Sequence, residues 1–192
     1  MKKLLPTAAI LIAAITGGCG QPGSDGATPL PRRYAYPRFE PYDTSSVIYN
    51  FEGLNLRINA QAKPIPQGQG WLDLSFPRYG ATVHLTYTHN HTEASISSAI
   101  KNRKERMDLN LGEAEAYVSE YKTGAGFSCL EIIAADALVT PVQFLAVDND
   151  GRMLSGACVL AEDDAPADSI RPVVEAIADE VRRMLTSLST KK

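Results

Sequence analysis

Residues 139–160, VTPVQFLAVDNDGRMLSGACVL, contain two apolar runs joined by a short polar turn. Asp150-Gly151 between such runs is a strong β-hairpin signal, because glycine readily adopts the positive φ that tight hairpin turns require. The runs 139–147 and 153–160 are therefore predicted to be antiparallel strands, and the apolar run 127–133 predicts a third strand before them. Together the three runs predict an antiparallel meander.

Helices are predicted on both sides of the meander. After it, apolar residues repeat at steps of three and four from Ile170 to Leu188, which is the pattern of an amphipathic helix. Before it, residues 92–107 have near-helical apolar spacing without an interrupting proline. A further helical turn or two is predicted over residues 114–121, after a break at Gly112.

Strands are predicted in the first half of the chain, where apolar and polar residues alternate. They cover residues 47–52, 54–60, 71–76 and 82–87. Residues 63–70 contain two prolines and two glycines and are predicted to be a loop. The element order predicts an α+β fold with an antiparallel sheet of about six to seven strands, a mid-chain helix and a C-terminal amphipathic helix.

The N-terminus has the three regions of a secretory signal. Lys2 and Lys3 precede the uncharged apolar run 4–15, and small residues lead from there to Cys19. The run is shorter than the roughly 20 residues that span a bilayer. We therefore predict that residues 1–18 are a signal peptide and that Cys19 is acylated; the alternative is an ordinary secretory signal followed by an incidental cysteine.

The mature chain is predicted to consist of a tether and one domain. Residues 19–31 contain too few apolar side chains to pack and are predicted to be a flexible tether, and residues 32–192 are predicted to form a single domain. Gly20 is not the aspartate that commonly retains lipoproteins at the inner membrane. We expect the protein at the outer membrane, facing the periplasm.

The three cysteines are too few for a disulfide scaffold in a chain of 192 residues. A periplasmic location would permit one disulfide between Cys129 and Cys158. Two-residue turns in the meander would, however, place Cys129 opposite Val142 and Cys158 opposite Gln143, two strands apart and on opposite faces. A disulfide needs Cα atoms within roughly 7 Å, so both thiols are predicted to be reduced and buried.

Metal and catalytic motifs are weak in this sequence. His84, His89 and His91 lie close together, with Asp73 predicted across a hairpin from His84, but their spacing is not that of a zinc site. Residues 148–151 resemble half of a calcium loop without its twelfth-position glutamate, and a turn explains them better. No nucleophile or phosphate-loop motif occurs, and we expect no metal, no cofactor and no enzymatic activity.

Two charged segments are candidate contact surfaces. The net charge of −3 gives no general attraction to nucleic acid. Lys101, Arg103, Lys104 and Arg106 form a basic run that either contacts anionic lipid or an acidic partner, or is simply a solvated helix face. An N-terminal arm contains residue types that dominate protein interfaces, and it either binds partners or packs on its own domain. The predicted partner-binding residues of this arm are Arg32, Arg33, Tyr34, Tyr36 and Phe39. The arm also contains Arg38.

Short motifs along the mature chain, in this order and spacing, resemble those of the GldD family of gliding motility lipoproteins of Bacteroidetes. They are Cys19, Pro31-Arg32-Arg33-Tyr34, Trp71, Phe76-Pro77, Tyr87, Gln143-Phe144, Asp148, Leu154-Ser155-Gly156-Ala157, Pro166, Asp168-Ser169 and Pro172-Val173. The element order is also similar to the PsbP/Mog1-like fold. The resemblance implies a non-catalytic envelope lipoprotein that supports the gliding machinery and type IX secretion, with other envelope proteins as partners. The alternative is a periplasmic, lipid-anchored module that binds a small ligand.

Overall fold

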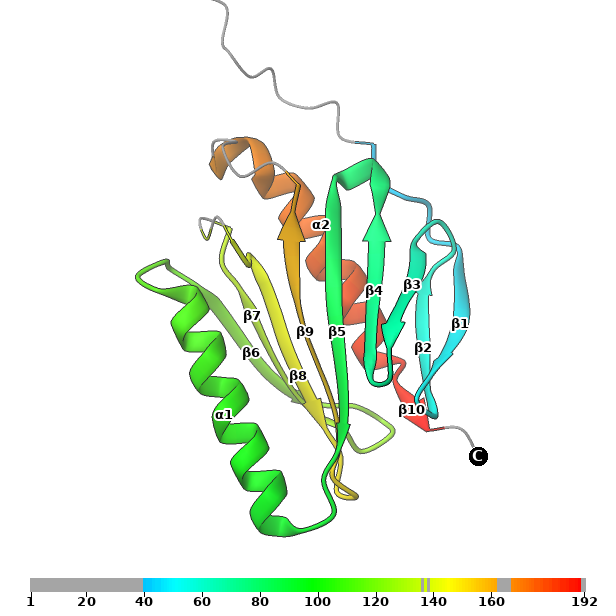
Figure 1. The fold of residues 1–192 in the computed structure, drawn as a ribbon. Coiled ribbons are helices and arrows are strands. Elements are labelled where there is room, and N and C mark those ends of the chain that lie inside the picture. Colours follow the sequence, from blue (N-terminus) through cyan, green and yellow to red (C-terminus); the bar gives the residue numbers. More distant parts are fainter. Residues whose placement is uncertain (1–39, 136, 138, 162–166, 191–192) are drawn as a thin grey trace, which may run out of the picture. The chain divides into compact units, whose positions relative to one another are not determined.

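The computed structural model describes residues 40–135, 137, 139–161 and 167–190. In these residues the chain forms ten strands, one short 3-10 helix and two α-helices (Figure 1). The elements are β1 (Ser46–Phe51), β2 (Leu54–Asn59), β3 (Lys63–Gly68), β4 (Trp71–Phe76), η1 (Pro77–Tyr79), β5 (Ala81–His89), α1 (Glu93–Leu111), β6 (Tyr117–Lys122), β7 (Ser128–Ile133), β8 (Val142–Val147), β9 (Arg152–Leu160), α2 (Ala167–Thr186) and β10 (Ser189–Thr190).

Seven of the strands form one antiparallel sheet in the order β3-β4-β5-β9-β8-β7-β6. The pairing of β5 with β9 joins the first hairpins to the predicted meander. With nine residue pairs, it is the longest strand pairing in the sheet. Along each strand, successive side chains point to opposite faces of the sheet, as the pleat of the backbone requires. The predicted α+β class and the predicted strand number of this sheet are confirmed.

The two helices cover opposite faces of the large sheet (Figure 1). The amphipathic helix α2 buries Val174, Ile177, Val181 and Leu185 against the larger core. On the other face, α1 covers only the part formed by β7, β8 and β9, and Met107 is its one fully buried residue. Within the described part of the chain, α1 therefore leaves β4 and β5 uncovered on this face of the sheet.

A second sheet of three strands, in the order β1-β2-β10, packs against α2. Alternation in β2 directs Leu54, Leu56 and Ile58 into the larger core, while the residues between them face outward. The strands predicted at 47–52 and 54–60 are thus confirmed as strands. They belong to this small sheet, and the large sheet reaches seven strands through β3 and β6 instead.

Two predictions from local composition were wrong. Residues 63–70, predicted to be a loop, contain β3, because a strand at a sheet edge tolerates prolines whose missing N–H would face solvent. Residues 114–121, predicted to be helical, contain β6, whose aromatic and β-branched residues favour a strand once β7 is available to pair with it. The mid-chain helix also runs four residues further than predicted, to Leu111, where Gly112 ends it with a positive φ.

The predicted register of the meander was also wrong. Gln143 pairs with Ala157 rather than Cys158, and Cys129 pairs with Ala146 rather than Val142. The β8–β9 connection is residues 148–151, longer than the assumed two-residue turn, and its register differs from the prediction by one residue. The connection between β7 and β8 is also longer than assumed, and the register there differs by four residues. Cys129 and Cys158 consequently lie on the same face of the sheet, in the larger core.

Candidate functional site

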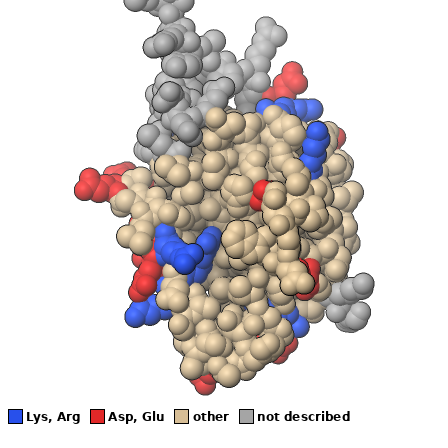
Figure 2. Space-filling view, in the orientation of Figure 1, with Lys and Arg blue, Asp and Glu red and all other residues tan. Residues whose placement is uncertain are grey.

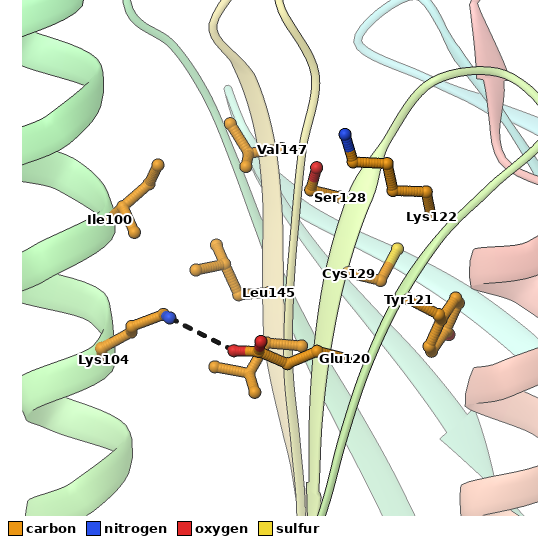
Figure 3. Close-up of a pocket in the computed structure, with 10 residues that line it drawn as sticks. Ile100, Lys104, Glu120, Tyr121, Lys122, Ser128, Cys129, Leu145 and Val147 are labelled. Carbon is orange, nitrogen blue, oxygen red and sulfur yellow. Dashed lines mark hydrogen bonds and ion pairs between the residues drawn. The ribbon is translucent and has the colours of Figure 1, made fainter.

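A cleft of about 430 Å³ lies between α1 and the strands β6, β7 and β8. Figure 3 shows Ile100 of α1 facing Leu145 and Val147 of β8 across this space. The cleft is lined by Ile100, Lys104, Glu120, Tyr121, Lys122, Ser128, Cys129, Leu130, Leu145 and Val147. An apolar floor with a few polar groups at the rim is typical of binding sites.

The rim of the cleft carries two lysines and one glutamate. Lys104 Nζ lies 3.5 Å from Glu120 Oε1, and this ion pair crosses from α1 to β6 (Figure 3). Lys122, at the end of β6, is a second exposed amine on the rim. Because both partners of the ion pair are largely exposed, the pair contributes little to stability and leaves the rim accessible.

The predicted basic run lies on α1, where Lys104 lines the cleft and Lys101 faces solvent. Figure 2 shows one group of Lys and Arg side chains over α1, at the left of the view. Lys101 pairs with Glu105 at 3.8 Å on the exposed surface. Arg103 is half-buried, and burial lowers the pKa of its guanidinium; its Nε has no hydrogen-bond partner among the described residues.

The open face of β4 and β5 holds the predicted Asp73–His84 pair. The two residues are opposite each other in the register, and His84 Nδ1 lies 2.6 Å from Asp73 Oδ1. Gln67 Nε2 donates to the other carboxylate oxygen of Asp73 at 2.8 Å. His89 and His91 are elsewhere, with ring centroids 4.3 Å apart. Within the described part of the chain, no three His, Cys, Asp or Glu side chains are grouped as metal ligands.

The predicted calcium-like segment forms the β8–β9 turn. Asp148 Oδ1 accepts hydrogen bonds from the backbone N–H of Asp150 and of Arg152 at 3.0 and 2.9 Å, and its Oδ2 accepts from Arg152 Nε at 2.6 Å. Gly151 has a φ of +80°, and a Cβ there would overlap the carbonyl oxygen of Asn90. The turn interpretation of this segment is confirmed.

Both thiols of the domain are free and buried. Burial raises the pKa of Cys129 and of Cys158 to about 12, and the nearby Glu131 carboxylate adds to the effect on Cys129. A nucleophilic or metal-binding cysteine needs the opposite shift. The thiols are therefore packing residues, as predicted, although they share a face.

Cys19 and the arm residues Arg32, Arg33, Tyr34, Tyr36 and Phe39 lie outside the described residues. The described chain begins close to the arm, at Glu40, and Tyr42 is the first residue with several contacts. The Tyr42 N–H donates to the Tyr79 hydroxyl at 2.6 Å, and the Tyr42 hydroxyl accepts from the Arg78 N–H at 3.0 Å. The Arg78 guanidinium lies over the Tyr42 ring, so Tyr42 is held against η1.

The sequence profile of the family described as gliding motility lipoprotein GldD matches residues 27–190. This chain belongs to the GldD family. It is therefore a gliding-motility-related lipoprotein of the cell envelope, as the resemblance implied. The matched range of this GldD chain contains the arm residues and every described helix and strand.

Two further comparisons accompany this family match. No protein of curated function matches this GldD chain. Among solved structures, the Ran-binding protein Mog1p of Saccharomyces cerevisiae is similar, with a TM-score of 0.48 and 8% sequence identity; the similarity covers 77% of the GldD chain and 96% of Mog1p. No helix in the described residues of the GldD chain is long and apolar enough to cross a membrane.

Sequence reasoning missed the cleft of this GldD chain. Its β6 wall was predicted to be helical, so that Glu120 and Lys122 had no predicted relation to the basic run on α1. The usable signal was the polar-apolar alternation of YVSEYK, which is short and equally compatible with a helical turn. Only the pairing of β6 with the next strand, β7, decides between them.

Proposed function

We propose that this chain is a non-catalytic envelope lipoprotein that supports the assembly or stability of the gliding motility machinery and the associated type IX secretion apparatus. The observation that carries the proposal is the match of the GldD profile over residues 27–190. In the described domain, the buried carboxylates of Glu131 and Glu180 accept structural hydrogen bonds from neighbouring side chains. These hydrogen bonds give both carboxylates a structural role in the domain.

Anchoring is assigned to Cys19. The charged start, the short apolar run and the small residues before this cysteine support acylation, and two or three acyl chains hold a protein durably on a membrane. Gly20 supports a final position at the outer membrane, facing the periplasm.

Partner binding is assigned to the arm residues Arg32, Arg33, Tyr34, Tyr36 and Phe39. Arginine and aromatic side chains are the types most often found at the energetic centres of interfaces. The contacts of Tyr42 with η1 support this role, because they fix the position at which the arm leaves the domain.

The test is crosslinking followed by affinity purification from native membranes. Changing Tyr34, Tyr36 and Phe39 together to Ala should leave cooperative thermal unfolding intact but remove the copurifying motility or secretion components. The matched control is Trp71→Ala, which removes an exposed aromatic side chain from β4 and should leave copurification unchanged. If the partners persist with the altered arm, or if the wild type recovers no motility or secretion component, the proposal is wrong.

A second candidate function is binding of a small ligand, and the cleft beside α1 is the observation that favours it. Its apolar floor and two lysines suit an anionic amphiphile. A ligand at one hundred times its dissociation constant adds roughly 2.7 kcal/mol of stability, which a thermal-shift screen detects. A Leu145→Trp change, which fills the floor, should abolish such a shift.

A further inference from the structure

The two edges of the large sheet differ in their capacity to pair with another strand. Pro64 and Pro66 lie in the edge strand β3 and deny it two N–H donors. Prolines at an edge are a common protection against further pairing. The opposite edge strand, β6, contains no proline, and no strand of the described residues pairs with its outer side.

The phase of the ladder shows which backbone groups of β6 are unpaired. Residues of an antiparallel strand direct their N–H and C=O groups alternately to either side. The Thr123 N–H donates to the Phe127 carbonyl at 2.9 Å, so alternate residues from Tyr121 back to Tyr117 bond to β7. The backbone groups of Val118, Glu120 and Lys122 consequently face the free edge.

A second hydrogen bond independently indicates which residues of β7 bond to β8 and which bond to β6. The Ala134 N–H donates to the Pro141 carbonyl at 2.8 Å, which continues the β7–β8 ladder. Leu130 and Ile132 therefore bond to β8, and the residues between them bond to β6. Both assignments leave the same three residues of β6 with outward donors and acceptors.

The side chains along this edge define the chemistry of an occupant. Tyr117 and Val118 are exposed by 66% and 55%, an unusual exposure for adjacent large residues of a strand. Further along β6, Lys122 lines the apolar cleft, and Lys104 of α1 lines it from the other side. Glu120 offsets Lys104, and Glu113 and Glu115 precede β6, so the excess positive charge is at the Lys122 end.

We propose that the free edge of β6 receives an extended segment of a partner protein, which adds a strand to the sheet and directs acidic side chains toward Lys104 and Lys122. The apolar side chains of the same segment alternate with the acidic ones and would lie on the opposite face of the sheet, beside the exposed Tyr117. Backbone hydrogen bonds supply affinity in this binding mode, and alternate side chains supply specificity. The inference rests on the proposed partner-binding function but uses a surface separate from the arm.

The probe is a synthetic peptide of alternating valine and glutamate, about eight residues long to match a typical strand. It is titrated into the full-length protein in lipid nanodiscs, and amide hydrogen exchange is read residue by residue. Exchange at Val118, Glu120 and Lys122 should slow at least about tenfold, while exchange at β3 is unchanged. A peptide with lysine in place of glutamate should bind at least about tenfold more weakly.

The decisive variant is Val118→Pro, which removes an outward N–H without removing a bond to β7. It should weaken peptide binding about tenfold or more, while the matched Val118→Thr, which keeps the N–H, should change it less than about threefold. Lys122→Glu should also weaken binding, and Lys63→Glu on the proline-containing edge should not.

Several outcomes would overturn the proposal. They are equal binding by Val118→Pro and wild type, equal binding of the glutamate and lysine peptides, protection of β3 instead of β6, or occupation of the edge by a second copy of the chain in sedimentation. If Val118→Pro unfolds, the comparison of Lys122→Glu with Lys63→Glu tests the proposal, and equal peptide binding by these two variants would overturn it. Because the peptide is measured without the arm's partners, failure here leaves the proposed function of the arm untouched.

Discussion

Arg182 of α2 donates through Nε to Oε2 of Glu131 in β7 at 3.0 Å, across the main helix–sheet interface. The Glu131 side chain is only 2% exposed, and its other oxygen accepts a hydrogen bond from the Tyr121 hydroxyl at 2.9 Å. Burial and the Glu131 charge raise the pKa of Tyr121 far above its usual value, so that its hydroxyl remains a donor. One carboxylate thereby links β6, β7 and α2.

Arg182→Ala should destabilise the domain by about 1–3 kcal/mol, because it leaves a buried carboxylate with one partner. The value is below that for a fully buried pair because the Arg182 side chain is 42% exposed. Lys101→Ala, which removes an exposed ion pair on α1, should cost about 0.3 kcal/mol. Urea unfolding of both variants measures the difference; equal small losses would show that Glu131 does not depend on Arg182.

Gly156→Ala should destabilise the domain by about 1–3 kcal/mol through overpacking. A Cβ at this position would lie 2.5 Å from the Phe144 ring and 2.6 Å from the His84 carbonyl oxygen. The matched control is Gly124→Ala, where an added Cβ meets nothing within 4 Å and φ is not positive. Thermal unfolding of the pair checks this expectation, and a neutral Gly156→Ala would mean that β8 and β9 separate easily.

Stability should fall as pH rises above about 8.5. In the unfolded chain the thiols ionise near that pH, whereas the folded domain keeps Cys129 and Cys158 protonated to about pH 12. The folded state then binds more protons, so each thiol lowers the free energy of unfolding by up to about 1.4 kcal/mol per pH unit above pH 8.5. Tyr79 and Tyr87, whose pKa values burial also raises, extend the loss above pH 10.

The variant that isolates this effect is Cys158→Ala. It should be less stable than wild type at pH 7 because a buried side chain is shortened, yet its stability should decline less steeply between pH 9 and 11. Equal slopes would remove Cys158 from the explanation. In the folded protein at pH 8, both thiols should also resist alkylation, and they should react once urea unfolds the chain.

Gln143→Leu should loosen the last turns of α1. The buried Gln143 side chain donates through Nε2 to the Met107 carbonyl and accepts from Asn110 Nδ2, both at 3.2 Å. Losing both bonds should cost about 1–2 kcal/mol and speed amide exchange over residues 107–111 before any change in β8. Asn110→Ala removes only the second bond and should have the smaller effect. If neither variant speeds exchange over residues 107–111, Met107 holds the helix by packing alone.

Cys19→Ala should release the protein from membranes into the soluble periplasmic fraction, because the acyl chains supply the anchoring energy. Fractionation and mass spectrometry of the N-terminal peptide measure the result. Membrane sedimentation that is unchanged in the variant, together with an unmodified wild-type peptide, would contradict acylation.

The sequence was sufficient for elements whose pattern is strong over many residues. The α2 periodicity, the β4–β5 hairpin with its Asp73–His84 pairing, and the meander all depend on local alternation or spacing. Recognition of the family came from ordered short motifs, and it carried the functional prediction. These features could be predicted because the local propensity, the hydrophobic pattern and the turn residues all indicate the same structure.

Elements that form strands only because a neighbouring strand pairs with them could not be predicted in this way. β3 is a strand because β4 offers it an edge, despite its prolines, and β6 is a strand because β7 pairs with it. The register of β8 with β9 differs by one residue from the prediction, because the turn between them spans residues 148–151 and is closed by the Asp148 carboxylate. The cleft depends on both β6 and the position of α1, so no local pattern indicates it.

The contacts of Tyr42 have a mechanical consequence for a protein tethered by its N-terminus. A pull from the membrane reaches Tyr42 before it reaches β1, because Tyr42 precedes Ser46 in the chain. Hydrogen bonds and ring contacts with Arg78 and Tyr79 divert that force into the corner between β4 and β5. Under the proposed anchoring at Cys19, tension would therefore load the contacts of Tyr42 with this corner before it loads the pairing of the edge strand β1 with β2.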